Sequence, residues 1–207
     1  MYTPAAFKDD DLNRLHGLMD HTRLAILVTS DDDGIQASHL PLLLRREQGA
    51  YGTLYGHLAK ANPQCQALAK GAQVMVIFPG ADAYVSPSFY PAKAEHGKVV
   101  PTWNYIAIHA YGVAEAFTDA ARLLEVVSGL TDKHEAGRAS PWAVADAPAD
   151  YIEKMLGAIV GFTLPVERLE GKRKLGQNRS AADVAGVRDG LAASADLKDQ
   201  ELAHLMS

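Results

Sequence analysis

Short apolar runs separated by turn signals dominate the first half of the chain. The runs over residues 24–29, 35–46, 51–58 and 73–78 are typical of β-strands, and residues 106–113 alternate between apolar and polar positions. Turns rich in glycine, aspartate and proline separate the runs. This spacing favours short strands in a mostly antiparallel sheet.

Turn residues and prolines set the expected limits of these strands. Residues 31–34, three aspartates followed by a glycine, predict a hairpin turn rather than a calcium loop, because the EF-hand spacing is missing. Pro41 cannot donate to a strand ladder, so its strand is expected at a sheet edge or at a bulge. Pro79 and Gly80 are expected to end the strand over 73–78.

Capping residues and apolar stripes predict helices that interrupt and follow the strands. The expected helices cover residues 9–20, 62–71, 119–129, 148–156, 180–193 and 197–206, and a strand pattern returns over 159–169. The order of elements favours the α+β class, as a small, mostly antiparallel β-barrel decorated by helices. We expect a single domain over residues 1–207, with a helical C-terminal extension from about residue 180.

Composition narrows the class of protein. The chain has 207 residues, is 48% hydrophobic and carries a formal charge of −5, which argues against a basic nucleic-acid-binding surface. Its single cysteine excludes an intramolecular disulfide, and no Cys/His cluster has zinc-ligand spacing. The start does not resemble a signal peptide, and no apolar run is long enough to span a bilayer. A soluble cytoplasmic protein is the expectation.

One candidate anion site lies before the helix expected over residues 62–71. Asn62 is a suitable N-cap, and His57 and Lys60 precede it. Unpaired N–H groups at a helix N-terminus together with a nearby ammonium attract an anion such as a phosphate. A capped helix with two ordinary solvated side chains is the alternative.

A second candidate site lies in the aromatic stretch over residues 84–113. In an extended chain Thr102 and Asn104 point to one face, and Trp103 and Tyr105 point to the other. Such a segment allows one face to hydrogen-bond a flat polar ligand while the other face packs. An aromatic cluster at a sheet edge is the alternative.

Several other chemistries find little support. The sequence has no G-x-G-x-x-G, P-loop, H-E-x-x-H or G-x-S-x-G motif. Cys65 is expected as a packed thiol, and His39 and His109 as strand histidines. Haem ligation by His109 or His57 is an alternative. The basic run over 172–174 is either a solvated turn or an anion contact.

Five segments together resemble the PaiB-type FMN-binding negative transcriptional regulators. These segments are SHLPLLL, GHLAKANPQ, AYVSPSFYPAK, VPTWNYIAIHAYG and EGKRKLGQNRS, and the resemblance covers nearly the whole chain. It implies an FMN-binding split β-barrel, related to pyridoxamine-phosphate oxidases, and a homodimer with FMN at the subunit interface. Phe89, Cys65 and Gly176 depart from the usual pattern, which puts the details of the pocket wall in question.

The resemblance also implies which residues bind the cofactor. The implied phosphate site is His57, Lys60 and Asn62. The implied ring site is Ser38, His39 and Leu40, with Thr102, Trp103, Asn104 and Tyr105 lining it from the same or the other subunit. Further candidates on the C-terminal loop are Lys172, Gln177 and Asn178.

The aromatic side chains also suggest where two copies would meet. An exposed aromatic surface is typical of an interface core, and two-fold pairing is the commonest oligomer. We therefore expect a homodimer through a surface that includes Phe89, Tyr90, Trp103 and Tyr105.

The leading hypothesis is an FMN-binding regulator whose flavin is a sensing or structural group. A flavin-dependent oxidoreductase on the same barrel is one alternative, and a haem-binding or haem-degrading barrel is another. No general acid or base stands out, so no catalytic residue is assigned. Because the charge is acidic and no helix-turn-helix is recognisable, repression would need a local basic patch for DNA or a protein partner.

Overall fold

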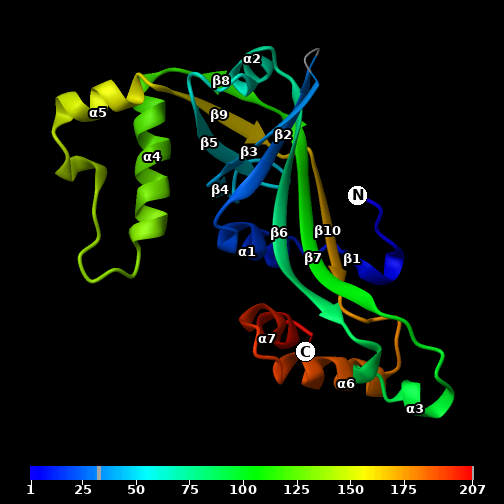
Figure 1. The fold of residues 1–207 in the computed structure, drawn as a ribbon. Coiled ribbons are helices and arrows are strands. Elements are labelled where there is room, and N and C mark those ends of the chain that lie inside the picture. The colour runs from blue at the N-terminus through cyan, green and yellow to red at the C-terminus, as the bar shows by residue number, and fades with distance from the viewer. Residues whose placement is uncertain (32–33, 207) are drawn as a thin grey trace. The chain divides into compact units, whose positions relative to one another are not determined.

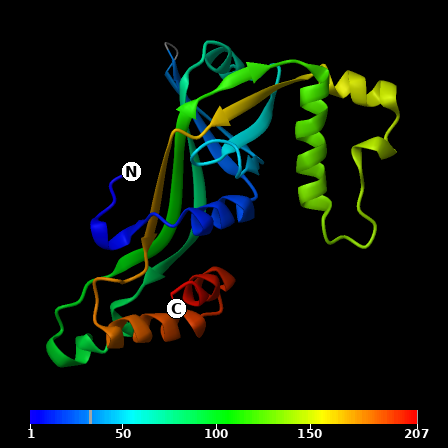
Figure 2. The ribbon, with the colours of Figure 1, turned by 180° about the vertical axis from the view of Figure 1, so that it is seen from behind.

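The computed structural model describes residues 1–31 and 34–206, which form two compact units (Figures 1 and 2). Unit 1 comprises Met1–Asp11, Pro79–Ile108 and Glu170–Ser207, and unit 2 comprises Leu12–Phe78 and His109–Leu169. The expected turn residues Asp32 and Asp33 lie outside the described residues.

Unit 2 contains most of a sheet built around strand β2 (Ala25–Asp31). β2 pairs antiparallel with β3 (Gly34–Leu40) on one side and with β6 (Gln73–Val85) on the other. The strand order of this sheet is β1-β10-β7-β6-β2-β3, and both β6 and β7 (Thr102–Val113) contribute residues to each unit. Leu27 of β2 faces the interior and is fully buried.

The second sheet of unit 2 has four antiparallel strands. Their order is β4 (Leu43–Arg45), β5 (Thr53–Ala59), β9 (Ile159–Pro165) and β8 (Glu115–Phe117). One face is fully buried through residues such as Leu54, Phe162 and Leu164.

Helices cover the other face of the second sheet. Asp119 is the N-cap of α4 (Ala120–Glu135), and its carboxylate accepts a hydrogen bond from the N–H of Arg122 at 2.9 Å. After α4 the chain returns through a short 3-10 turn (Val144–Asp146) and α5 (Ala149–Leu156) to the end where α4 begins (Figures 1 and 2). The buried cluster between these helices and the sheet is Phe117, Leu123, Val126, Leu130 and Leu156.

Two shorter helices complete unit 2. α1 (Leu12–His21) buries Leu15, His16 and Met19, and α2 (Gln64–Ala69) follows β5. No helix among the described residues is long and apolar enough to cross a membrane.

Unit 1 contains the chain termini and most of the aromatic stretch. Its elements are η1 (Ala5–Phe7), β1 (Lys8–Asp9), η2 (Pro87–Phe89), α3 (Ala92–His96), most of β10 (Arg168–Lys174), α6 (Ala181–Ala192) and α7 (Leu197–His204). α6 begins as expected, because the hydroxyl of Ser180 accepts from the N–H of Asp183 at 3.1 Å.

The expected α+β class with antiparallel pairing and C-terminal helices is confirmed. The expected strand over 35–46 is divided at Pro41 into β3 and β4, which belong to different sheets. β3 and β4 are each an edge strand of their sheet, so the predicted edge position of Pro41 is confirmed.

Two predicted strand limits are wrong. β6 does not end at Pro79, because pairing with β2 covers only Val74–Ile77 and the proline lies beyond that ladder. The expected strand over 159–169 is two strands, since β9 ends at Pro165 and β10 begins at Arg168. As a result, the basic residues 172–174 lie in a strand rather than in a solvated turn.

The expected aromatic surface is also partly wrong. Tyr90 is buried, and the ring of Phe89 packs against Gly190 of α6. Trp103 remains exposed and Tyr105 is half-buried. The expected exposure is therefore wrong for Tyr90, and an interface that includes the other aromatic side chains stays a prediction.

Candidate functional site

A network of buried hydrogen bonds brings together two of the predicted cofactor residues, Ser38 and Asn62. The side-chain amide of Asn62 donates to the hydroxyl of Ser38 at 2.9 Å, and that hydroxyl donates to the side-chain oxygen of Gln64. The amide nitrogen of Gln64 donates to the hydroxyl of Thr29 at 3.0 Å and to the carbonyl of Leu27 at 3.3 Å. This network attaches the start of α2 to strands β2 and β3.

The start of α2 differs from the expectation in one respect. The helix begins at Gln64 rather than directly after Asn62, and Pro63 is its N-cap. The side-chain oxygen of Asn62 accepts from the N–H of Gln64 at 2.9 Å, so one of the first N–H groups is already bonded. With only six residues, α2 provides little dipole for an anion. The phosphate hypothesis therefore depends mainly on the charge of Lys60.

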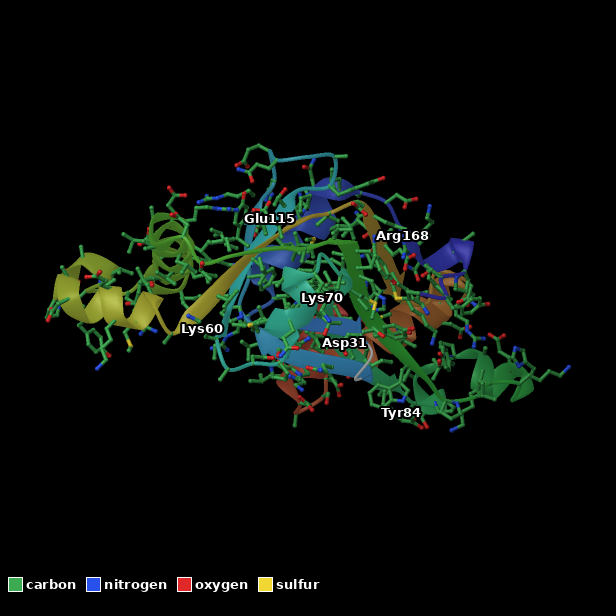
Figure 3. All side chains as sticks on the ribbon, turned by 90° about the horizontal axis from the view of Figure 1, so that it is seen from above. Asp31, Lys60, Lys70, Tyr84, Glu115 and Arg168 are labelled. Atoms are coloured by element: carbon green, nitrogen blue, oxygen red, sulfur yellow. The ribbon has the colours of Figure 1, made fainter. Side chains whose placement is uncertain are left out.

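Lys60 lies at the end of β5, where Figure 3 shows it near the start of β9. Its backbone N–H donates to the carbonyl of Ala158 at 2.9 Å, which connects it to the residue before β9. Its side chain is exposed and makes no hydrogen bond or ion pair with the described part of the chain. The ammonium of Lys60 is thus available to an anionic ligand.

His57 carries an unsatisfied polar atom. It lies opposite Gly161 in the β5–β9 pair, on the face of the sheet that the α4 cluster covers. Its Nδ1 is buried and has no hydrogen-bond partner among the described residues, and burial lowers the pKa of this histidine. No hydrogen bond joins His57 to Ser38 or Asn62 in the described chain.

Cys65, within α2, is half-buried. Its Sγ lies 3.5 Å from the carbonyl of Ala59, and burial raises the pKa of the thiol. These features agree with the expected packed thiol, because the thiolate is the reactive form.

The other face of the first sheet is apolar across unit 2. The β2 ladders place Ile26 beside Ile77 and His39, and Val28 beside Met75. None of these five side chains is buried, whereas the inner-face residues of β2 and β6, such as Leu27 and Val76, are. We call this surface, Ile26, Val28, His39, Met75 and Ile77, the outer face.

The strand alternation separates the three residues expected at the flavin ring. His39 is exposed on the outer face, whereas Ser38 lies on the inner face opposite Leu27. Leu40 is 4% exposed and belongs to the core. Of the three, His39 alone presents its side chain on the outer face.

In unit 1, Thr102 and Trp103 are held by Lys174. The ammonium of Lys174 donates to the hydroxyl of Thr102 at 2.6 Å and to the carbonyl of Trp103. Burial lowers the pKa of Lys174. The ring of Trp103 is 53% exposed and meets the ring of Tyr84 edge-on, with centroids 5.9 Å apart. An aromatic surface is therefore present at the start of β7.

Asn104 and Tyr105 have interior roles. Asn104 is 3% exposed, and its amide nitrogen lies 3.8 Å from the sulfur of Met206. The ammonium of Lys172, itself buried, lies 4.9 Å from the centre of the Tyr105 ring and donates to the carbonyl of Tyr2 at 3.0 Å. The polar face of the PTWNY segment thus packs, and the aromatic face is the more accessible one.

The C-terminal loop candidates are mostly engaged within unit 1. Gln177 accepts from the N–H of Leu175 at 2.8 Å and donates to the carbonyl of Arg173 at 2.6 Å. Arg173 lies 3.8 Å from the carboxylate of Asp9. Asn178 is exposed. The basic run over 172–174 is therefore largely occupied by contacts inside the protein.

The predicted residues form two groups, one in each unit. The first group, in unit 2, contains Ser38, His39, Leu40, His57, Lys60 and Asn62. The second group, in unit 1, contains Thr102, Trp103, Asn104, Tyr105, Lys172, Gln177 and Asn178.

Sequence reasoning missed Gln64 and the outer face. Gln64 follows Pro63 in a polar segment, and nothing in its neighbours marks it as buried. The outer face did leave a signal, because the runs over 24–29 and 73–78 are continuously apolar. Continuous runs are typical of strands covered on both faces.

Comparisons with known proteins add independent evidence. Residues 1–168 match a family model described as "Putative FMN-binding domain". The protease synthase and sporulation protein PAI 2 of Bacillus subtilis is 31% identical over 206 residues, which cover 100% of this chain and 96% of that protein. An uncharacterized protein of Emericella nidulans is 32% identical over 225 residues, which cover 92% of this chain and 90% of that protein.

A solved structure shows the same fold. The FAD and heme binding protein from Mycobacterium smegmatis superimposes with a TM-score of 0.61 at 21% identity, over 86% of this chain and 78% of that chain. The expected split β-barrel fold is thereby confirmed.

Proposed function

Because the chain belongs to the PaiB-type family of FMN-binding-domain proteins, we propose that it is a flavin-binding regulator with FMN at a homodimer interface. The observation that carries this proposal is the outer face, an apolar surface on the far side of a sheet whose inner side is already core.

The outer face supports an interface on physical grounds. Antiparallel sheets with one solvated side normally carry polar residues there. Here Ile26 lies between Ile77 and His39, and Val28 lies beside Met75, so two adjacent cross-strand rows are largely apolar. These four apolar side chains are partly exposed, and a contiguous apolar patch that solvent reaches favours an interaction site. A flavin ring or a second copy of the chain could each pack against the apolar side chains of the outer face.

The residues present fit FMN. The phosphate needs a cation, and Lys60 has an unpartnered ammonium in the described chain. The ring needs flat contacts and polar edge groups, and the exposed imidazole of His39 on the outer face suits that need. A bound flavin would supply the redox chemistry, while the chain supplies binding and electrostatics.

The proposed regulation relies on a protein partner rather than on direct contact with DNA. The most notable cluster of basic residues in the sequence is the run over 172–174. Lys172 donates to the carbonyl of Tyr2, Arg173 to that of Leu205 and Lys174 to Thr102. These internal contacts, together with the net charge of −5, leave this run poorly suited to neutralise phosphates.

Cofactor binding is tested on the purified full chain with FMN, FAD, riboflavin and haemin. FMN should raise the melting temperature more than the other three, because a ligand that binds only the folded state stabilises it by mass action. A Soret band with no response to any flavin would overturn the flavin proposal. Turnover with a nicotinamide donor would favour the oxidoreductase alternative over a regulator.

The dimer is tested by sedimentation of the parent and of Val28→Lys. The parent should sediment as a dimer, and the variant as a monomer, since a charge would be buried at the outer face. Gln66→Lys, on an exposed position of α2, is the control and should remain dimeric. A parent that is monomeric at every concentration would contradict the interface.

A further inference from the structure

A pocket of about 290 Å³ lies in unit 2 between the second sheet and α4, and none of the predicted cofactor residues lines it. Its apolar floor is formed by Leu43 of β4, Phe117 of β8 and Val126 of α4. Gly129 lets β4 approach the helix, because a Cβ there would lie 2.8 Å from a methyl carbon of Leu43 and 3.7 Å from a guanidinium nitrogen of Arg45. A side chain at position 129 would therefore displace Leu43, one of the residues that line the pocket.

Two opposite charges line the same pocket without neutralising each other. Arg45 and Glu125 are both exposed, and neither side chain makes a hydrogen bond or an ion pair with the described part of the chain. Arg122, by contrast, is paired with Glu115 at 3.0 Å and lies 4.0 Å from the centre of the Phe117 ring. The pocket therefore offers one available cation and one available anion above an apolar floor.

We propose that this pocket is a second ligand site, which binds a free α-amino acid with an apolar side chain. The carboxylate of the amino acid pairs with Arg45, since a guanidinium matches a carboxylate bidentately. The ammonium pairs with Glu125, and the side chain contacts Leu43 and Val126. Tyr55, whose hydroxyl donates to Gln48 at 2.6 Å, provides a further polar wall.

The charges and the volume select this class of ligand. A simple carboxylate would face the unpaired Glu125, and a simple amine would face Arg45, so a zwitterion satisfies both groups at once. A volume of about 290 Å³ corresponds to roughly ten non-hydrogen atoms at the density of liquid water. Leucine and phenylalanine are of this size. The site is independent of the flavin, because it uses different residues.

Calorimetric titration of the full chain tests the proposal with three probes. L-leucine should bind saturably in the millimolar range, as expected for a small ligand. N-acetyl-L-leucine lacks the ammonium and isopentylamine lacks the carboxylate, so each should bind about tenfold more weakly or worse, the loss expected for one charge-assisted hydrogen bond. Binding of N-acetyl-L-leucine or isopentylamine as tight as that of L-leucine, or no saturable binding of L-leucine, would overturn the proposal.

Substitutions of the two charged lining residues test whether L-leucine binds in this pocket. Arg45→Gln and Glu125→Gln should each weaken L-leucine binding about tenfold. Arg46→Gln is the matched control, because Arg46 pairs with Asp20 and does not line the pocket, and it should bind as the parent does. Melting curves establish that each variant is folded. Unchanged leucine affinity in a folded Arg45→Gln protein would place the ligand elsewhere and contradict the assignment.

Discussion

The side-chain amide of Asn62 donates to the hydroxyl of Ser38 at 2.9 Å, and so connects the loop before α2 to strand β3. The resemblance assigned these two residues to different parts of the cofactor, yet the structure joins them directly. Their bond continues into the buried amide of Gln64, which reaches β2. The position of this loop therefore depends on polar contacts inside unit 2.

Gln64→Leu should destabilise the protein by about 1–3 kcal/mol, because removing the amide leaves buried polar groups without partners. Gln64 is 1% exposed, and its amide serves Thr29 and two backbone carbonyls. Gln66→Leu on the exposed side of the same helix is the control, with a change within about 0.5 kcal/mol. Urea unfolding measures both. Equal midpoints for the two variants would show that the network contributes nothing.

Lys60→Ala should weaken FMN binding roughly ten- to hundredfold, the effect of losing one charge-assisted hydrogen bond of about 1.5–3 kcal/mol. Folding should be almost unaffected, because the side chain is exposed and unpartnered in the described chain. Riboflavin, which lacks the phosphate, should lose far less affinity. Fluorescence titration of the two ligands measures the difference.

Lys70→Ala is the matched control for this measurement. Lys70 is an exposed lysine at the other end of α2, and its loss should leave FMN affinity unchanged. If Lys60→Ala binds FMN as tightly as the parent does, Lys60 is a solvated surface residue and the phosphate binds elsewhere.

Local signals in the sequence predicted the elements well. Asp119 and Ser180 mark the starts of α4 and α6, and each accepts the expected backbone hydrogen bond. These signals act over three residues and need no knowledge of the fold. The edge position of Pro41 was predicted from the residue itself, whereas the division of this segment into β3 and β4 was not.

Contacts between distant residues were not predictable. Lys172 is buried because Tyr2, 170 positions earlier, accepts its hydrogen bond. Phe89 is half-buried because its ring packs against Gly190 in α6, which has no side chain to block it. A local pattern cannot distinguish such residues from a solvated basic run or from an exposed aromatic. The expected exposure of Tyr90 is wrong for the same reason, because this side chain is buried within unit 1.

Gly190→Ala should destabilise the protein by about 1–3 kcal/mol through overpacking. A Cβ at this position would lie 2.4 Å from a ring carbon of Phe89. The same substitution at Gly17 in α1 is the control, since a Cβ there meets nothing within 4 Å. Gly17→Ala should stabilise by about 0.5–1 kcal/mol, because alanine favours a helix interior.

The double variant Gly190→Ala, Phe89→Ala tests whether the ring of Phe89 is the group that a side chain at position 190 would clash with. Phe89→Ala alone removes the packing of the ring, and adding Gly190→Ala to it should then cost little more. Thermal unfolding of the four proteins completes the cycle. Additive losses in the double variant would mean that Phe89 is not the group that excludes a side chain at Gly190.

The isolated protein should bind duplex DNA only weakly at physiological salt. Non-specific affinity comes mainly from Lys and Arg neutralising phosphates, whereas this chain has a net charge of −5 and engages Lys172 and Lys174 internally. Fluorescence anisotropy over a series of salt concentrations measures the affinity and its salt slope. Tight binding with a steep slope would reveal a basic face formed by other residues.

His57 should make the stability of the protein depend on pH below neutrality. Burial lowers the pKa of this histidine from 6.5 in the folded state, so the unfolded chain binds the proton more readily. Stability is therefore lost as the pH falls below about 6.5, and the loss levels off once the folded-state pKa is passed. Burial gives the direction of this pKa shift, and the buried Nδ1 has no hydrogen-bond partner among the described residues that would offset it.

His57→Leu should remove this dependence. Urea unfolding of the parent and the variant at a series of pH values from about 7.5 to 5 measures it, and the parent should lose stability more steeply than His57→Leu as the pH falls. His134→Leu, at an exposed position of α4, is the control and should keep the slope of the parent. Parallel slopes for the parent and His57→Leu would show that this imidazole does not titrate differently in the folded protein. Saturating FMN should flatten the slope of the parent if the phosphate approaches His57, since an anion would favour the charged imidazole.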